Sequence, residues 1–379
     1  MGKSSFGRRG RRLALAALLA LSVAVPAPVA RAFAEGVDGL SAQAAQDGRA
    51  WSAAGDLKVA GGVEGVDWRL DGTVLHVTGP APLTLANADG VATSATTVRV
   101  DPGVAADLTL AGVHIASATV CPIDVATNLY GTADGSRAAR GSQIVAPTSL
   151  YLKVADGTEN SLTVTAGGSI YAGIRCGEGS SLVVDDGRDN RDASGAMARV
   201  EGDKVAADIV LSDGTVVEAG SHASALDSDN PGYLEVHGGG QGSGIGGSSY
   251  EDGGTLTFNG GRLKVDVYGW NFSGEGGTSY SAGIGAGGEA NGTATAMTFN
   301  GGTIETHGGL HGAGIGAGHS DCSGYGAMLP DAIPTPRLGR GVTYAGDINI
   351  NGGFIESFGG WRGGAFGSAC WSTNAGHTV

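Results

Sequence analysis

The sequence predicts an all-β protein, a single-stranded right-handed parallel β-helix (solenoid) with Gly-rich irregular coils and loops inserted at its corners. Glycine makes up 71 of the 379 residues, far above its usual share of about 7% and without the Gly-X-Y period of collagen. Two short glycine motifs recur in step through the second half of the chain. No stretch after residue 34 shows a sustained helical period, whereas short apolar–polar alternations, typical of strands with one buried face, are frequent.

The first recurring motif is Gly-Ile-Gly, at residues 244–246, 283–285 and 314–316, with Ala-Phe-Gly at 365–367 as a degenerate copy. Weaker copies stand earlier, at 121–124, 172–174 and 225–227. A unit this small cannot bury its own apolar face, so equivalent units must stack in parallel on one another. We therefore expect one inward column built from Ile245, Ile284, Ile315 and Phe366.

The second motif is Asn-Gly-Gly between two short alternating strands, at 256–261, 297–302 and 348–353. Asn-Gly-Gly is typical of a hairpin turn, but it also suits a corner between two flat faces of a solenoid. Its regular recurrence favours the corner. The register then predicts two further columns, an apolar one of Phe258, Phe299 and Ile350, and a ladder of amides formed by Asn259, Asn300 and Asn351.

The spacing between the anchors is uneven, which a β-helix tolerates because insertions protrude from its corners as loops. The largest insertions are expected at 187–203 and at about 319–344. The second contains Pro330, Pro334 and Pro336, and proline cannot continue a hydrogen-bonded ladder. The first half of the chain fits the same architecture with weaker strands, among them 98–100, 107–115, 150–154 and 182–184.

Residues 1–34 are predicted to be a secretory signal peptide. A basic start is followed by an uncharged apolar run from Leu13 to Val25, and Ala32-Phe33-Ala34 offers a cleavage site. Residues 35–59 are then an N-terminal segment or cap, and residues 60–379 form one β-helix domain that ends within a repeat, as expected of a truncated product. We expect an extracellular or cell-surface location and no membrane span in the mature chain.

The net charge of the chain excludes some classes of binding partner. Six of the 23 basic side chains lie before residue 35, where no acidic one stands, so the remainder carries 17 basic and 37 acidic side chains, a net charge of −20. Such a surface repels nucleic acid and anionic lipids. Neutral glycans, cations and other proteins remain.

The succession of strands from residue 107 to 184, followed by the Gly-Ile-Gly and Asn-Gly-Gly units, resembles a known group over about residues 60–379. It is similar to the secreted parallel β-helix proteins of Gram-positive bacteria described as carbohydrate-binding-domain proteins. The resemblance implies an extracellular or wall-associated location and binding of a polysaccharide. A host or cell-wall surface is a further expected partner. It also admits calcium as a cofactor, but no calcium ligand of the group can be matched to a residue of this chain.

Two acidic loops carry oxygen ligands of the kind that calcium prefers. One contains Asp227, Asp229 and Asn230, although Pro231 departs from the EF-hand pattern. The other contains Asp185, Asp186 and Asp189. A polar surface loop is the alternative interpretation of both.

A sugar site would need exposed aromatic rings, which cover the apolar face of a pyranose. Trp270 and Trp361 each follow a glycine just after the second strand of their unit, with Tyr268 and Tyr280 close by and Trp371 extending the row. We expect these rings to line one edge of the solenoid. Rings that cap the core beneath the loops would give the same sequence pattern.

Four cysteines stand in a chain predicted to be exported, so disulfides are allowed. Cys322 and Cys370 follow equivalent anchors in consecutive coils and are the favoured pair, while Cys121 and Cys176 are expected to remain buried thiols. His307 and His311, with His319 and Asp321 downstream, supply zinc-type ligands, but their glycine-rich spacing is unspecific, and chance clustering beside the repeat is the favoured alternative.

An enzymatic function is a further possibility, because parallel β-helices include pectin-cleaving enzymes. Asp185-Asp186 is a carboxylate pair and Arg262-Leu263-Lys264 resembles the basic tripeptide of polygalacturonases, yet the remaining Asn-Thr-Asp and Gly-His-Gly elements are missing. We therefore expect a non-catalytic carbohydrate-binding protein. The alternatives are a structural or protein-binding adhesin and, after it, a polysaccharide lyase or hydrolase.

Overall fold

The computed structural model describes residues 50–125, 147–177, 179–249, 251–269, 279–288, 296–319, 345–361, 363–367 and 369. The described part is all-β, with strands that pair mostly in parallel and no α-helix among them. The predicted signal peptide, residues 1–34, lies outside the described residues.

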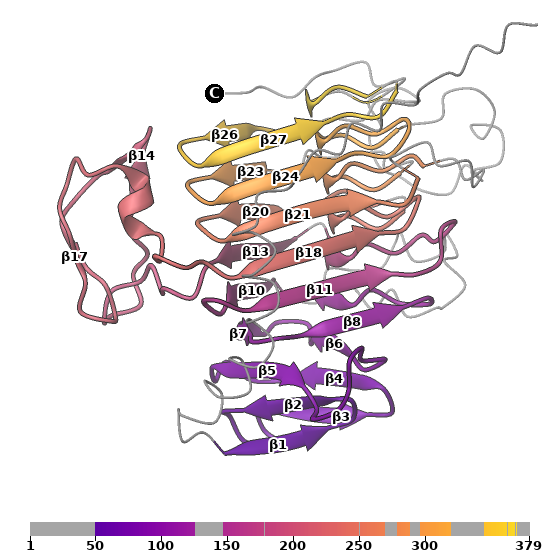
Figure 1. The fold of residues 1–379 in the computed structure, drawn as a ribbon, viewed down its shortest axis with the longest axis horizontal. Coiled ribbons are helices and arrows are strands. Elements are labelled where there is room, and N and C mark those ends of the chain that lie inside the picture. The colour runs from indigo at the N-terminus through magenta and orange to yellow at the C-terminus, as the bar shows by residue number, and fades with distance from the viewer. Residues whose placement is uncertain are drawn as a thin grey trace, which may run out of the picture.

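Three sheets, here numbered 1 to 3, contain nearly all the strands (Figure 1). Sheet 1 has the order β1 (Trp51–Ala54), β2 (Leu57–Ala60), β5 (Leu83–Asn87), β7 (Ala105–Leu110), β10 (Thr148–Val154), β13 (Ser180–Asp185), β20 (Thr255–Phe258), β23 (Ala296–Phe299), β26 (Ile348–Ile350). Sheet 2 has the order β8 (His114–Ser117), β11 (Glu159–Val164), β18 (Tyr233–Gly238), β21 (Arg262–Val267), β24 (Thr303–His307), β27 (Phe354–Phe358). Sheet 3 has the order β3 (Trp68–Asp71), β4 (Val74–Val77), β6 (Thr97–Val100), β9 (Ile123–Val125), β12 (Ile174–Cys176), β19 (Ile245–Gly246), β22 (Ile284–Gly285), β25 (Ile315–Gly316), β28 (Phe366–Gly367).

From β7 to β28 the chain visits sheets 1, 2 and 3 in strict rotation, interrupted once between β13 and β18. Each pass, called a coil below, lays its strands in parallel on those of the coil before, as the colour gradient of Figure 1 shows. This arrangement is compatible with the predicted β-helix. At the N-terminal end the pairs β1–β2, β2–β5 and β3–β4 are antiparallel instead.

The predicted columns are confirmed. Ile245 pairs with Ile284, and Ile284 with Ile315, all fully buried, and Ile315 pairs with the partly exposed Phe366. The weak copies at 121–124 and 172–174 are confirmed as well, because Ile123 pairs with Ile174 and Ile174 with Ile245. In sheet 1 the rings of Phe258 and Phe299 stack at 4.9 Å, and Ile350 follows them in register.

Asn-Gly-Gly is a corner, as predicted, since the strands on either side of it join different sheets. Asn300 donates its side-chain N–H to Oδ1 of Asn259 at 2.9 Å, and Asn351 donates to Oδ1 of Asn300 at 2.8 Å. At this corner, the side-chain amide of each coil therefore forms a hydrogen bond with the amide of the next coil.

The glycine after each anchor isoleucine is required by its backbone. Gly246 and Gly285 have φ of 133° and 132°, a region that residues with a side chain rarely adopt. A Cβ on Gly246 would stand 2.0 Å from the carbonyl oxygen of Gly285 in the next coil. The repeated tripeptide thus permits the close approach of one coil to the next.

The interruption between β13 and β18 is a projecting lobe, residues 187–231, visible at the left of Figure 1. It contains two antiparallel pairs, β14 (Val200–Glu201) with β15 (Lys204–Val205) and β16 (Ile209–Val210) with β17 (Val216–Val217), and a 3₁₀ helix, Ala223–Leu226. Its own small core consists of Val205, Leu211, Val217 and Leu226. The interpretation of 225–227 as an early anchor copy is wrong, because Leu226 packs into this lobe rather than into the column of isoleucines.

Candidate functional site

A groove of about 540 Å³ lies on the outer face of sheet 1, beside the lobe. Alternate residues of three neighbouring strands form its floor, because successive side chains of a strand point to opposite faces. The lobe supplies one wall, at residues 189–195 and 212, and Pro80 and Pro82 border it as well. The outward-facing floor residues are Ala105, Asp107, Ser149, Tyr151, Ser181 and Val183.

A second hollow of about 460 Å³ adjoins the first and shares Ser149 and Ser181 with it. Its lining is rich in hydroxyl groups and glycines, including Thr148, Ser180 and Thr255. The two hollows together form one trough across β10 and β13. Its floor mixes small hydroxyl side chains with the apolar Val183 and the ring of Tyr151.

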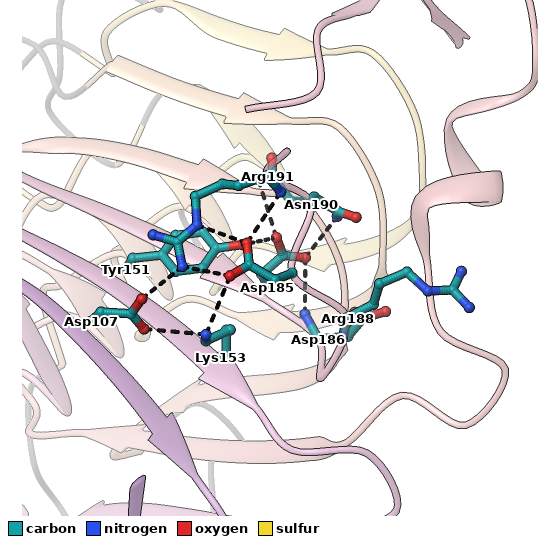
Figure 2. A network of polar contacts seen from close by, with 10 residues as sticks. Asp107, Tyr151, Lys153, Asp185, Asp186, Arg188, Asn190 and Arg191 are labelled. Atoms are coloured by element: carbon teal, nitrogen blue, oxygen red, sulfur yellow. Dashed lines mark hydrogen bonds and ion pairs between the residues drawn. The ribbon is translucent and has the colours of Figure 1, made fainter. Parts of the chain in front are cut away.

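The wall of the groove is fixed by a network of charged side chains (Figure 2). Arg191 from the lobe bridges two carboxylates through Nη2, which lies 2.6 Å from Oδ2 of Asp107 and 2.6 Å from Oδ2 of Asp189. Lys153 on β10 approaches the same two groups at 3.3 and 3.5 Å. These cations outweigh the effect of burial and hold the pKa of the Asp189 carboxyl below its ordinary value. The lobe is thereby tied to sheet 1.

Tyr151 lies at the centre of the network. The guanidinium of Arg191 stacks over its ring at 4.1 Å, as Figure 2 shows, and its hydroxyl donates to Oδ2 of Asp185 at 2.6 Å. Burial and the neighbouring carboxylate raise the pKa of the Tyr151 hydroxyl, so it remains a donor at any physiological pH. Tyr151 thus connects the groove to the buried acids behind it.

The acidic loops predicted to hold calcium do come together. Ser228 N donates to Oδ2 of Asp186 at 2.6 Å, which joins the loop at 227–230 to the loop at 185–189. Asp185 and Asp186 are fully buried. Asp229 and Asn230 are exposed, and Asp189 belongs to the Arg191 network.

Most oxygens of these acids already accept hydrogen bonds from the protein. Asp185 accepts from Tyr151 and, at 3.0 Å, from Asn190, and Asp186 accepts from the backbone N–H groups of Arg188 and Ser228. Oδ1 of Asp227 is buried without a hydrogen-bond partner. Calcium requires six to eight oxygens, and most of the buried carboxylate oxygens here are already engaged by the protein, so the calcium site stays a prediction.

Asp185 has a second role that the sequence did not reveal. It occupies the position of the asparagine ladder one coil earlier, and Asn259 approaches its Oδ2 at 3.5 Å. Burial, together with the neighbouring Asp186, raises the pKa of this carboxyl even though Tyr151 opposes the shift. The ladder of amides therefore begins at an acceptor inside the site network.

Only part of the predicted row of aromatic rings lies within the described residues. Trp361 is 69% exposed on the last described coil. Tyr268 is half-buried and lies against the backbone of Gly167, and the half-buried Tyr280 packs edge-on to His311 at 5.5 Å and beside His319 at 4.8 Å. Trp270 and Trp371 lie outside the described residues. The row stays a prediction, and none of its described members lines the groove.

The cysteine prediction is confirmed in its described half. Cys121 and Cys176 are buried free thiols, and burial raises the pKa of each to about 12, which makes them unreactive. The favoured pair, Cys322 and Cys370, lies outside the described residues.

Arg262 and Lys264, from the basic tripeptide of the sequence, point outward from sheet 2, on a different face from the groove.

Sequence reasoning missed the groove and the residues that build its wall, Asp107, Tyr151, Lys153 and Arg191. One signal was available, because Asp107, Tyr151 and Lys153 alternate with buried apolar residues and so stand at outward-facing positions of their strands. Their meeting with Arg191 depends on how the lobe folds back, which no local pattern encodes.

Comparison of the chain with protein-family models, with curated proteins and with solved structures finds no match. Within the described part of the chain, no helix has the length and apolar character needed to cross a membrane.

Proposed function

We propose that this chain is an exported carbohydrate-binding protein built as a right-handed parallel β-helix, with the trough on sheet 1 as its glycan site. The strict rotation through three sheets supports the β-helix. The hand follows from the general rule that crossovers between parallel strands are right-handed in about 98% of cases. Export rests on the signal-peptide pattern of residues 1–34.

The observation that carries the proposal is the trough itself, which crosses at least two coils and is lined by hydroxyls and carboxylates held in place before any ligand arrives. Sugar hydroxyls both donate and accept, so they match carboxylate acceptors, serine hydroxyls and guanidinium donors. The ion pairs of Arg191 and Lys153 fix the wall in one geometry, which lowers the entropic cost of binding. An open trough suits an extended chain rather than a single small molecule.

The test is binding of the purified chain to a panel of neutral and acidic polysaccharides, by affinity electrophoresis and calorimetry, with and without a calcium chelator. Val183 faces outward from the floor, so Val183→Trp fills the trough without entering the core. We expect this variant to lose at least about tenfold in affinity for the retained glycan.

A matched control is available on the same sheet. Thr298 occupies the same outward position two coils later and lines neither hollow. Thr298→Trp should bind as wild type does. Equal binding by wild type and Val183→Trp, or no retention on any polysaccharide at millimolar concentration, would refute the glycan site. New reducing ends or unsaturated products would instead establish a polysaccharide-cleaving enzyme.

A second candidate function, a protein-binding adhesin or stalk, is favoured by the surface of the lobe. Val210 and Val216 are 55% and 65% exposed on neighbouring strands β16 and β17, and Met197 is also exposed. Exposed apolar side chains grouped on a projecting element are typical of contact surfaces. Cell adhesion that survives glycan competition and is lost on Val210→Ser with Val216→Ser would support this function.

A further inference from the structure

The outer face of sheet 2 carries a cluster of imidazole and carboxylate groups that has no part in the trough. Glu235 and His237 alternate on β18 and so point to the same side. His237 stands directly opposite Asp266 on β21, in the next coil. One ligand atom from each of these three residues lies within 4.8 Å of the others.

We propose that Glu235, His237 and Asp266 form a binding site for a divalent transition-metal ion of the Zn²⁺ type. Imidazole nitrogen together with carboxylate oxygens is a donor set that zinc and its neighbours in the periodic table accept. All three ligands stand on strands of a continuous parallel sheet, so their separation is set by hydrogen-bonded backbone rather than by flexible loops. Three protein ligands leave further coordination positions for water or a ligand.

Asp266 is built as a ligand rather than left as a surface acid. Its side chain is 1% exposed, and Nδ1 of His307 in the following coil holds its Oδ1 at 2.7 Å. The ring of His307 is itself fixed by stacking on Phe358 at 4.8 Å. Such outer partners orient metal-binding carboxylates. With Oδ1 engaged by His307, Oδ2 faces His237 and Lys264.

The ammonium group of Lys264 lies between two carboxylates of the cluster. Its Nζ lies 3.3 Å from Oε1 of Glu235 and 3.7 Å from Oδ2 of Asp266, the two oxygens that the ion would use. The side chain is 32% exposed, so the ammonium group is free to turn into solvent when a dication takes its place. In the metal-free protein Lys264 therefore compensates the two carboxylates, and it competes with the metal.

The test is titration of the full chain with Zn²⁺ by calorimetry, and with Co²⁺ by its visible absorption. Wild type should bind one ion here, and His237→Ala should weaken this binding at least about 100-fold, more than the loss of an outer partner. His307→Ala should weaken it by about tenfold. Lys264→Met should tighten it at least roughly threefold, because a competing positive charge is removed.

His76→Ala is the matched control, since His76 forms a similar pair with Asp101 at 2.6 Å on sheet 3, away from this cluster. It should leave the affinity unchanged. Equal affinity of wild type and His237→Ala would overturn the proposal. So would a loss confined to His319→Ala, which would assign the ion to the His311–His319 pair, or a Lys264→Met variant that binds no more tightly than wild type. Circular dichroism establishes that each variant is folded.

Discussion

At the scale of single residues, buried acids dominate the chemistry of this protein. Asp185, Asp186 and Asp266 are at most 1% exposed. Their carboxylates contact a tyrosine hydroxyl, a backbone N–H and an imidazole, respectively. Burial of a charge is costly unless it is paired or hydrogen-bonded. Where one oxygen stays uncommitted, as in Asp227, the cost appears as a raised pKa.

The raised pKa values predict that stability falls as the pH rises. Burial raises the pKa of Asp186 to about 6, and burial together with the charge of Asp186 raises that of Asp227 to about 7. In the unfolded chain both titrate near 3.9. Between about pH 4 and 7 the folded protein therefore binds more protons than the unfolded one, so the free energy of unfolding decreases with pH in this window.

Urea unfolding in EDTA at pH 4.5, 6 and 7.5 measures this slope. Asp227→Asn should flatten the dependence, because the amide cannot ionise. Asp229→Asn, on the exposed part of the same loop, should retain the dependence of wild type. A slope of opposite sign in wild type would contradict the burial argument.

At the scale of elements, the coil is defined by its corners. The asparagine ladder satisfies polar groups between coils, while the glycine after each anchor isoleucine permits the close backbone approach. The amides satisfy polar groups at the Asn-Gly-Gly corner, and the glycines make room within sheet 3, where the backbones of consecutive coils approach closely.

The glycine after an anchor isoleucine should tolerate no side chain. A Cβ on Gly285 would stand 2.1 Å from the carbonyl oxygen of Gly316, in a backbone with φ of 132°. We expect Gly285→Ala to lower the free energy of unfolding by at least about 2 kcal/mol. Gly168→Ala provides the comparison, because a Cβ there meets nothing within 4 Å, and it should change stability by less than about 0.5 kcal/mol. Chemical denaturation of the two variants decides, and similar losses in both would contradict the steric argument.

At the scale of the whole molecule, stacking makes stability depend on position along the axis. Each coil contacts mainly the coils before and after it, so a repeat array behaves nearly as a sum of neighbour terms. Phe299 lies between Phe258 and Ile350 and is fully buried, whereas Ile350 on the last described coil is 37% exposed.

We therefore expect Phe299→Ala to cost about 3–5 kcal/mol and Ile350→Ala about 1 kcal/mol. Hydrogen exchange should show local loss of protection around β26 and β27 for Ile350→Ala, but loss across several coils for Phe299→Ala. Equal global destabilisation by both variants would indicate that the array unfolds as one cooperative block.

The sequence by itself determined the repeating parts. Gly-Ile-Gly, Asn-Gly-Gly and the alternation of apolar residues predicted the parallel stack, the columns at Ile284 and Phe299, and the ladder through Asn300. These features succeed because each depends on residues that recur at equivalent positions, so that one unit predicts the next. The same local pattern gave a wrong prediction at Leu226, because a similar tripeptide there belongs to the lobe.

Only the tertiary structure decided which outward-facing side chains meet. Asp107 and Arg191 are 84 residues apart, and His237 and Asp266 are brought together only by the register of two coils. Inward positions are constrained by packing and repeat from coil to coil, whereas outward positions vary freely. Coils of unequal length, and a lobe that folds back on sheet 1, then set the neighbours of each outward side chain through the hydrogen-bonded register.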